Sequence, residues 1–198
     1  VIRGPLVFII DSNNVNIQSF TIIAEIIFEN SSNCTFYNNN VQTEGPAKSV
    51  LIYYSSEINI LKNHITSHWL SIEVSHSRNC IIENNYIVGN ELEWSQIGIG
   101  ISHSTNITII HNHISRWLHG IVMRIPGTVD VIQNNFIGNI RHARFESRNF
   151  FSIFWDGNYW GRPRLLPCPI LGWLFILPIV YFDWHPAQEP YDIGVSLE

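Results

Sequence analysis

Two stretches of the chain carry one pattern: residues 77–87 read SRNCIIENNYI, and residues 104–114 read STNITIIHNHI. In each stretch an asparagine, Asn85 or Asn112, has apolar residues five and three positions before it and another two positions after it. Apolar residues at every second position are typical of a β-strand with one buried face. Each stretch therefore predicts a short strand, a polar corner at the asparagine and a further apolar contact.

The pattern recurs along most of the chain around equivalent positions, here called the anchors. The anchors are Phe20, Asn39, Asn63, Asn85, Asn112, Asn134 and Asn158. The six intervals between residues 20 and 158 average 23 residues. Apolar pairs eleven and thirteen positions before the anchors predict a second strand in each unit, except in the last unit, where Ser147 stands beside Phe145. The sequence thus predicts about seven coils.

In such a repeat each coil winds once around a shared interior and pairs in parallel with the next coil, about 4.8 Å away. The sequence therefore predicts an all-β, single-stranded parallel β-helix over residues 1–160, followed by a C-terminal cap over residues 161–198. A content of only four alanines and two lysines argues against a helical bundle. A β-sandwich of hairpins is the alternative fold, but a sandwich rarely keeps one apolar template through so many units.

Asparagine occupies every anchor except Phe20. Stacked asparagine side chains can hydrogen-bond to one another and to the backbone of the neighbouring coils. Asparagine also tolerates the left-handed conformation that a tight corner needs. We therefore expect the anchors to form a structural ladder. Its members are Asn39, Asn63, Asn85, Asn112, Asn134 and Asn158.

Charge and cysteine content exclude some classes of protein. With 16 acidic and 11 basic residues the net charge is −5, so the chain lacks the basic footprint of a nucleic-acid-binding protein. Three cysteines cannot form a disulfide framework. Cys34 and Cys80 share a repeat position two coils apart, so both should be buried and reduced. The chain begins at Val1 without a signal-peptide pattern, as expected of a fragment or a mature form.

The repeats resemble those of the NosD-like family of right-handed parallel β-helices, also described as carbohydrate-binding and sugar-hydrolysis domains with a pectin-lyase-like fold. Residues 77–87 and 104–114 carry the resemblance, together with WDGNYWG at 155–161 and DWHPAQEPY at 183–191. The resemblance implies an archaeal or bacterial protein that is extracellular, at the cell surface or periplasmic. NosD proteins are associated with copper delivery. The single methionine and the inward positions of Cys34 and Cys80 are a poor set of soft copper ligands.

Two outward columns of side chains are candidate binding sites. His76 and His103 stand nine positions before their anchors on adjacent coils, with Tyr54 in the same column. Stacking would place the two imidazoles about 5 Å apart. That spacing would suit a shared metal ion or a sugar-binding surface. The structural alternative is a row of stacked turn residues.

The second column directly follows the anchors and includes His64, Tyr86 and His113. Aromatic and imidazole faces among amides are what a sugar-binding groove needs. Ordinary stacking on a solvated sheet face is the alternative. The longest excursion between coils, residues 88–96, carries Glu91, Glu93 and Trp94, and Trp94 is a further candidate ligand-binding residue.

Catalytic motifs are weak. The sequence lacks the paired aspartates of polygalacturonases, an aspartate cluster with arginine typical of calcium-dependent lyases, and the Asp-Pro-His-Asp motif of the epimerase type. His111, Glu83 and Asp130 fall on different faces or coils. A polysaccharide lyase or glycoside hydrolase is therefore an alternative and not the main interpretation, catalytic residues stay unassigned, and no cofactor is expected.

Residues 165–182 contain no charged side chain and reach the lower length limit of a membrane span. The segment contains three prolines, which disfavours a span. A cap is the preferred interpretation, because the end of a β-helix must cover its core and its open strand edges. Trp160, Trp173 and Trp184 are the expected covering residues.

We expect a non-catalytic surface or secreted module that binds polysaccharide or a cell-envelope glycan, or that serves as an envelope scaffold. A carbohydrate-active enzyme and a NosD-like copper accessory protein are the alternatives. Repeat templates encode core packing, so they say little about chemistry.

Overall fold

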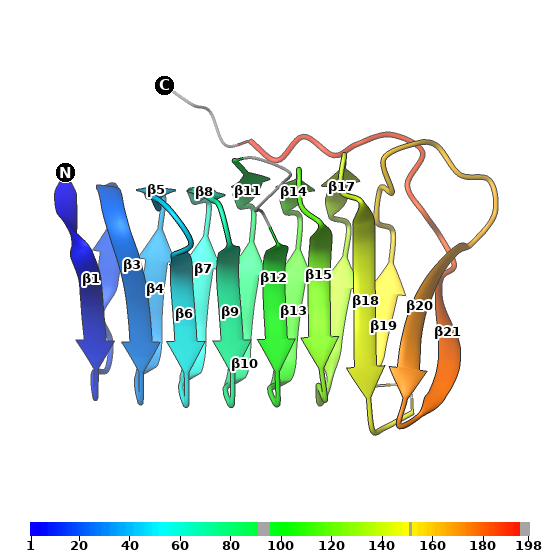
Figure 1. Ribbon diagram of the computed structural model, residues 1–198, viewed down its shortest axis with the longest axis horizontal. Coiled ribbons are helices and arrows are strands. Elements are labelled where there is room, and N and C mark those ends of the chain that lie inside the picture. The colour runs from blue at the N-terminus through cyan, green and yellow to red at the C-terminus, as the bar shows by residue number, and fades with distance from the viewer. Residues whose placement is uncertain (91–95, 151, 195–198) are drawn as a thin grey trace.

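The computed structural model describes residues 1–90, 96–150 and 152–194. The described chain forms a rod of stacked coils, in which each strand pairs in parallel with its counterpart in the next coil (Figure 1). No helix occurs in the part of the chain that the structure describes. The predicted parallel β-helix of about seven coils is confirmed.

The rod has three faces, here called A, B and C. Face A consists of β1 (Ile2–Ile10), β3 (Thr21–Glu29), β6 (Lys48–Tyr53), β9 (Leu70–Ser75), β12 (Ile97–Ser102), β15 (His119–Arg124) and β18 (Arg141–Ser147). Face B consists of β2 (Asn16–Gln18), β4 (Ser32–Tyr37), β7 (Ser56–Leu61), β10 (Arg78–Glu83), β13 (Thr105–Ile110), β16 (Val129–Ile132) and β19 (Ile153–Asp156). Face C consists of the short strands β5 (Asn40–Gln42), β8 (His64–Ser67), β11 (Tyr86–Gly89), β14 (His113–Ser115) and β17 (Asn135–Ile137).

Face C is more than the short apolar contact that the sequence indicated, because its residues form a third strand in successive coils. In the early part of the chain the single strand β3 turns the corner between two faces. Its first residues pair with β5 of face C, and its last residues pair with β6 of face A.

The core is filled by the columns of apolar side chains that the sequence predicted. From Ile22 onward, every apolar residue at five or three positions before an anchor, or two after it, is buried. In the first coil Val15 and Ile17 are only partly buried. Isoleucine dominates these columns because a β-branched side chain packs well on a pleated surface.

The asparagine ladder is present, and its hydrogen bonds run in one direction. The Oδ1 atom of Asn85 accepts hydrogen bonds from both the backbone N and the Nδ2 of Asn63, at 2.9 and 3.0 Å. Asn85 donates in the same way to Oδ1 of Asn112, and its Nδ2 also reaches the carbonyl of Ile60 in the preceding coil. Each buried anchor of this kind therefore joins three coils.

One expectation about the anchors is wrong: they do not adopt the left-handed conformation themselves. The residue before each anchor does, at Ser19, Asn38, Lys62, Asn84, His111, Gln133 and Gly157. The chain thus turns one residue earlier. This turn leaves the anchor side chain pointing inward, where it can join the ladder.

The C-terminal cap is a β-hairpin of β20 (Cys168–Leu174) and β21 (Leu177–Asp183). Strand β20 continues face A by pairing with the end of β18 (Figure 1). Its Cys168, Ile170 and Leu174 side chains are buried. Among the described residues, no helix is long and apolar enough to cross a membrane.

The cap buries fewer of its large side chains than the sequence indicated. Trp160 is buried, but Trp173 is 50% and Trp184 64% exposed, so the expectation that these two cover the core is wrong. A strand directs successive side chains to opposite sides, so β20 can bury only every second residue. Its alternate residues, and the hairpin tip at Phe175, Ile176 and Leu177, are exposed.

Candidate functional site

The first candidate column, Tyr54, His76 and His103, forms an exposed stack at the corner between faces A and B. All three residues have left-handed backbone conformations. Neighbouring rings stack with centroids 5.0 Å apart for Tyr54 and His76, and 4.9 Å apart for His76 and His103. A serine hydroxyl contacts Nδ1 of each imidazole, Ser75 at His76 and Ser102 at His103, both at 2.9 Å. The structural alternative for this column, a stack of turn residues, describes its geometry.

The geometry of this stack does not suit a shared metal ion. The two imidazole planes are only 9° apart, and the lone pair of a ring nitrogen lies in the ring plane. The free lone pairs of His76 and His103 therefore run side by side and do not converge. Across residues 1–90, 96–150 and 152–194, no three His, Cys, Asp or Glu side chains gather in a way that could hold a metal.

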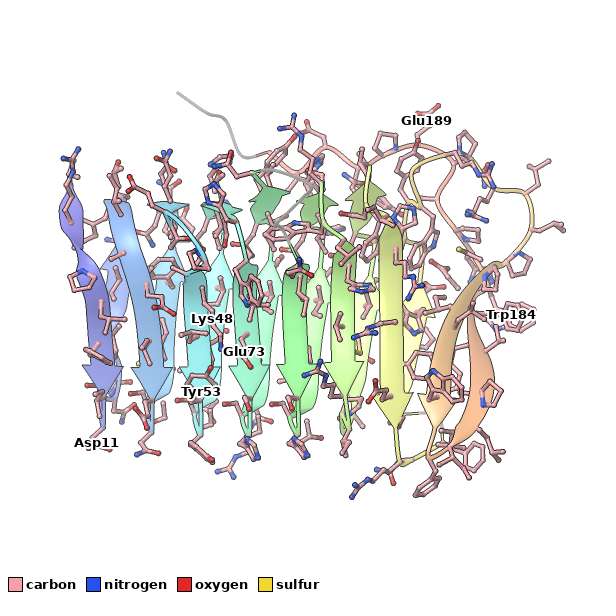
Figure 2. The ribbon with its side chains drawn as sticks, in the orientation of Figure 1. Asp11, Lys48, Tyr53, Glu73, Trp184 and Glu189 are labelled. Atoms are coloured by element: carbon pink, nitrogen blue, oxygen red, sulfur yellow. The ribbon has the colours of Figure 1, made fainter. Side chains whose placement is uncertain are left out.

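The second candidate column lies on face C, away from the first. In Figure 2, Asp11, which belongs to the column of Tyr54, lies near one long edge of the rod. Glu189, in the C-terminal tail, lies near the opposite edge. His64, Tyr86 and His113 are half-buried here and stack in order, with centroids 5.7 and then 4.0 Å apart.

Two adjoining hollows of about 480 and 550 Å³ lie over this second column. They share Tyr86, His113 and Ile137, so together they form one open trough, here called the groove. The turns that follow β11, β14 and β17 line the first hollow, and residues 190–194 of the C-terminal tail line the second.

The tail is fixed in place along the groove by specific contacts. The backbone of Tyr191 forms two hydrogen bonds with the side chain of Asn135, and its hydroxyl donates to the carbonyl of Gly157 at 2.7 Å. Figure 1 shows the tail running back from the hairpin across the ends of the face C strands. The groove therefore depends on a segment outside the repeats.

The histidines of the groove are held in their neutral form. Burial, followed by the charges of Arg116 and His64, lowers the pKa of His113 from 6.5 to about 4. Burial also lowers the pKa of His64. The imidazoles of the floor are therefore uncharged at neutral pH, and the charged side chains that line the groove are Arg116 in the first hollow and Asp192 in the second.

Residues 3–165 match the family described as periplasmic copper-binding protein (NosD). The chain belongs to the NosD family. No curated protein and no solved structure matched the chain.

Membership of the NosD family agrees with the coil geometry and supports the predicted right-handed β-helix. The family is described as periplasmic, which supports a location outside the cytoplasm. The match ends at residue 165, so it covers the coils and stops where the hairpin segment begins.

The orientation of the rings in this NosD chain differs from what a sugar-binding groove was expected to show. Tyr86 and His113 turn their faces toward each other, with planes only 6° apart. Their faces are therefore largely occupied, and their rims are directed into the groove. Such a row offers hydrogen-bonding edges instead of apolar faces.

Trp94, the remaining candidate, lies outside the described residues, as do Glu91 and Glu93. The described start of their loop, Gly89 and Asn90, lines the groove.

Two features of the chain were missed from the sequence. A serine ladder runs beside the first column, in which the backbone N of one serine donates to the hydroxyl of the next through Ser12, Ser31, Ser55, Ser77 and Ser104. Its signal was visible, since these serines all stand eight positions before an anchor. The second feature is Asp183, which follows the anchor Asn158 at the interval of a coil but does not carry the apolar template of the repeats.

Proposed function

We propose that this NosD-family chain is a non-catalytic envelope module that binds an uncharged glycan in the groove. The observation that carries the proposal is the trough over His64, Tyr86 and His113, whose floor is neutral and rich in hydrogen-bonding edges. Sugar hydroxyls are neutral donors and acceptors, so such a floor can bind them without desolvating a charge.

The spacing of the coils supports an extended ligand. Equivalent side chains recur on successive coils about 4.8 Å apart, so the row presents similar groups at regular intervals. A linear polymer with repeating hydroxyls can contact several coils at once. An open trough walled by the tail suits a chain that passes through it.

A catalytic role has less support. Lys48, Tyr53 and Glu73 cluster on the outer surface of face A (Figure 2), where Glu73 accepts hydrogen bonds from Lys48 at 2.7 Å and Tyr53 at 2.9 Å. Burial and Glu73 raise the pKa of Tyr53, so the phenol stays protonated. The cluster satisfies its own charges and offers one carboxylate, whereas glycoside hydrolysis uses a pair.

Copper binding is the second candidate, favoured by the family description. The described side chains do not fit it well. The rings of His76 and His103 are parallel, and Cys34, Cys80, Cys168 and Met123 are buried in the core.

A glycan array probed with the full chain tests the proposal, followed by titration calorimetry with the best oligosaccharide. Tyr86→Phe keeps the ring stack and removes one hydroxyl. It should weaken binding several-fold, since a hydrogen bond contributes about 0.5–1.5 kcal/mol. His103→Ala, at the other edge of the rod, is the matched control and should bind like the native chain.

Equal losses for Tyr86→Phe and His103→Ala, or no glycan retained, would contradict a groove on face C. Copper retained at one equivalent after dialysis, together with no glycan binding, would favour the second candidate. Formation of product from a bound polysaccharide would show that the chain is an enzyme and not a non-catalytic module.

A further inference from the structure

A second cavity, of about 770 Å³, lies where the hairpin leaves the last coil. Strands β18 and β20 pair only at Phe145–Ser147 with Gly172–Leu174, and nearer the start of both strands they separate. The gap lies between residues 141–144 of β18 and residues 168–171 of β20. Its volume falls within the range of small-molecule sites, about 300–1,000 Å³.

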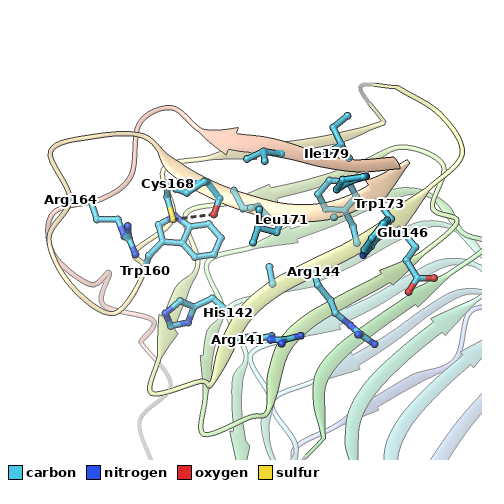
Figure 3. Close-up of a pocket in the computed structure, with 17 residues that line it drawn as sticks. Arg141, His142, Arg144, Glu146, Trp160, Arg164, Cys168, Leu171, Trp173 and Ile179 are labelled. Carbon is cyan, nitrogen blue, oxygen red and sulfur yellow. Dashed lines mark hydrogen bonds between the residues drawn. The ribbon is translucent and has the colours of Figure 1, made fainter. Parts of the chain in front are cut away.

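One side of this cavity is strongly basic. Arg141, His142 and Arg144 come from β18, and Arg164 comes from the loop before the hairpin (Figure 3). Across the described chain none of these three arginines forms an ion pair with a side chain. Glu146, the single carboxylate among the lining residues, is exposed and also without an ion pair there.

Nitrogen atoms without partners occur on three of the residues that line the cavity, with Arg164 and His142 at one end and Arg144 at the other (Figure 3). The Nε atoms of Arg144 and Arg164 and the Nδ1 atom of His142 are buried and have no hydrogen-bond partner within the described residues. Buried polar groups are nearly always hydrogen-bonded, so each such atom requires an explanation. Three of them around one hollow indicate a missing acceptor.

The opposite side of the cavity is apolar. Leu171, Trp173 and Ile179 of the hairpin face the basic residues, and Trp160 lies between the two sides (Figure 3). Gly172 keeps the strands close at the narrow end, because a Cβ atom there would lie 2.5 Å from the ring of Phe145. The site thus combines cationic donors with a wall suited to a hydrocarbon or aromatic body.

We propose that this cavity binds an organic anion, with a carboxylate or phosphate group against Arg164, at the end of the cavity where His142 also lies, and an apolar body against the hairpin. Guanidinium groups match the planar, bidentate geometry of carboxylates and the oxygens of phosphates. The lowered pKa of His142, about 4, is due first to burial and then to Arg164, which agrees with a cationic surrounding. This site is independent of the groove and of its glycan.

Titration calorimetry on the full chain tests the site with three probes: octyl phosphate, inorganic phosphate and 1-octanol. Octyl phosphate should bind with one-to-one stoichiometry, inorganic phosphate at least about tenfold more weakly, and octanol without measurable heat. Arg164→Gln should weaken octyl phosphate binding by about tenfold, as the loss of a charge-assisted hydrogen bond requires. Arg144→Gln, at the other end of the basic side, should weaken binding less. Arg78→Gln, an exposed arginine on face B, is the matched control and should bind normally.

Thermal unfolding gives a second readout. Saturating octyl phosphate should raise the Tm of the native chain and of Arg78→Gln, but not that of the double variant Arg144→Gln/Arg164→Gln. Vesicles of phosphatidylglycerol distinguish the source of the anion. Arginine-dependent binding to them indicates a membrane lipid, and binding of the free amphiphile alone indicates a soluble metabolite.

Three results would overturn the proposal. If octanol bound as tightly as octyl phosphate, the charge would play no part in binding. If inorganic phosphate bound as tightly as octyl phosphate, the apolar wall would play no part in binding. Undiminished binding to the double variant, or no heat and no Tm shift in the native chain, would show that the cavity does not hold the anion.

Discussion

The stacked coils and the C-terminal cap satisfy the asparagine ladder with different residues. In the coils, each anchor from Asn63 to Asn134 is satisfied by the same residue type one coil away. At the cap one carboxylate, Asp183, completes the ladder, while the hairpin leaves nitrogens of Arg144 and Arg164 without partners. Repetition thus satisfies the asparagine amides of the ladder, although other buried polar atoms of the coils, such as Nδ1 of His64 and Oγ of Ser71, also have no partner within the described residues.

Removing residues 165–198 should have the largest effect on this contrast. The truncation deletes Asp183 and the buried hairpin residues Ile170 and Leu174, so it exposes the core and the free edge of β18. Open strand edges template association between chains. Size-exclusion chromatography in plain buffer should show aggregates for the truncated chain and a soluble full chain.

A soluble, monomeric truncation beside a full chain that needs detergent would reverse this interpretation. The hairpin would then be a membrane-contacting element and not a cap. The exposed Phe175, Ile176 and Leu177 at its tip make the comparison informative.

Asp183→Ala should be the most damaging single substitution. Asp183 is fully buried and accepts hydrogen bonds from the backbone of Gly157, Asn158 and His185, the amide of Asn158 and the indole of Trp160. Leaving these donors unpaired should cost about 3–5 kcal/mol of unfolding free energy, the cost of breaking a buried charged network. Urea denaturation measures it.

Asp183→Asn is the matched control, because it keeps an acceptor oxygen in place and should lose less than the alanine variant. Equal denaturation midpoints for the native chain and both variants would show that the ladder does not need this carboxylate.

Asn85→Leu should destabilise the fold by about 1–3 kcal/mol, since the backbone N of Asn63 and the carbonyl of Ile60 lose their partner in the middle of the coils. Phe20→Asn, at the exposed end of the ladder, should cost less or be neutral. A harmless Asn85→Leu in urea titrations would mean that the hydrogen bonds of the ladder add no net stability.

The smallest expected effect concerns acid. His113 has a pKa of about 4 in the fold against 6.5 in an unfolded chain, so between these values the unfolded state binds more protons. The contribution of His113 to the free energy of unfolding should therefore be fully present above pH 6.5 and should decline as the pH falls toward 4. Because His113 is only half-buried, its share is about 1–2 kcal/mol.

His113→Gln removes this titrating group and should flatten the decline measured by urea unfolding at pH 7, 5.5 and 4.5. His142, whose pKa is also about 4, contributes to the same window and should leave a residual slope. A variant with the same pH dependence as the native chain would show that His113 is not held neutral by the fold.

The coils could be predicted from the sequence because the interactions that stabilise them recur at the same positions in every repeat. Residues such as Ile60, Ile82 and Ile109 occupy equivalent positions, so the alternation of apolar residues alone identifies the core. The ladder followed from the same spacing, whereas the left-handed position was misplaced by one residue. Composition indicates that a corner exists, and backbone geometry decides which residue forms it.

The cap and the basic cavity could not be predicted in the same way. Asp183 follows Asn158 by 25 residues, an interval like those between the anchors, but it lacks the apolar template around it and continues the ladder from an antiparallel strand. Arg141 and Arg144 lie on β18, and Arg164 lies in the loop before β20. All three line one cavity only because β18 and β20 separate near the start of both strands. Of the candidate sites, the stacks of each column were foreseeable, but the tail that walls the groove was not.

The one-way orientation of the ladder also bears on how the chain matures during synthesis. Each finished coil presents unused donors toward the coil that has yet to emerge, as Asn134 does for Asn158. Coils can therefore be added in sequence, each docking on a prepared template, but every intermediate keeps an unsatisfied growing end. That end is closed only by Asp183, so the last strand of the cap supplies the acceptor that ends the ladder.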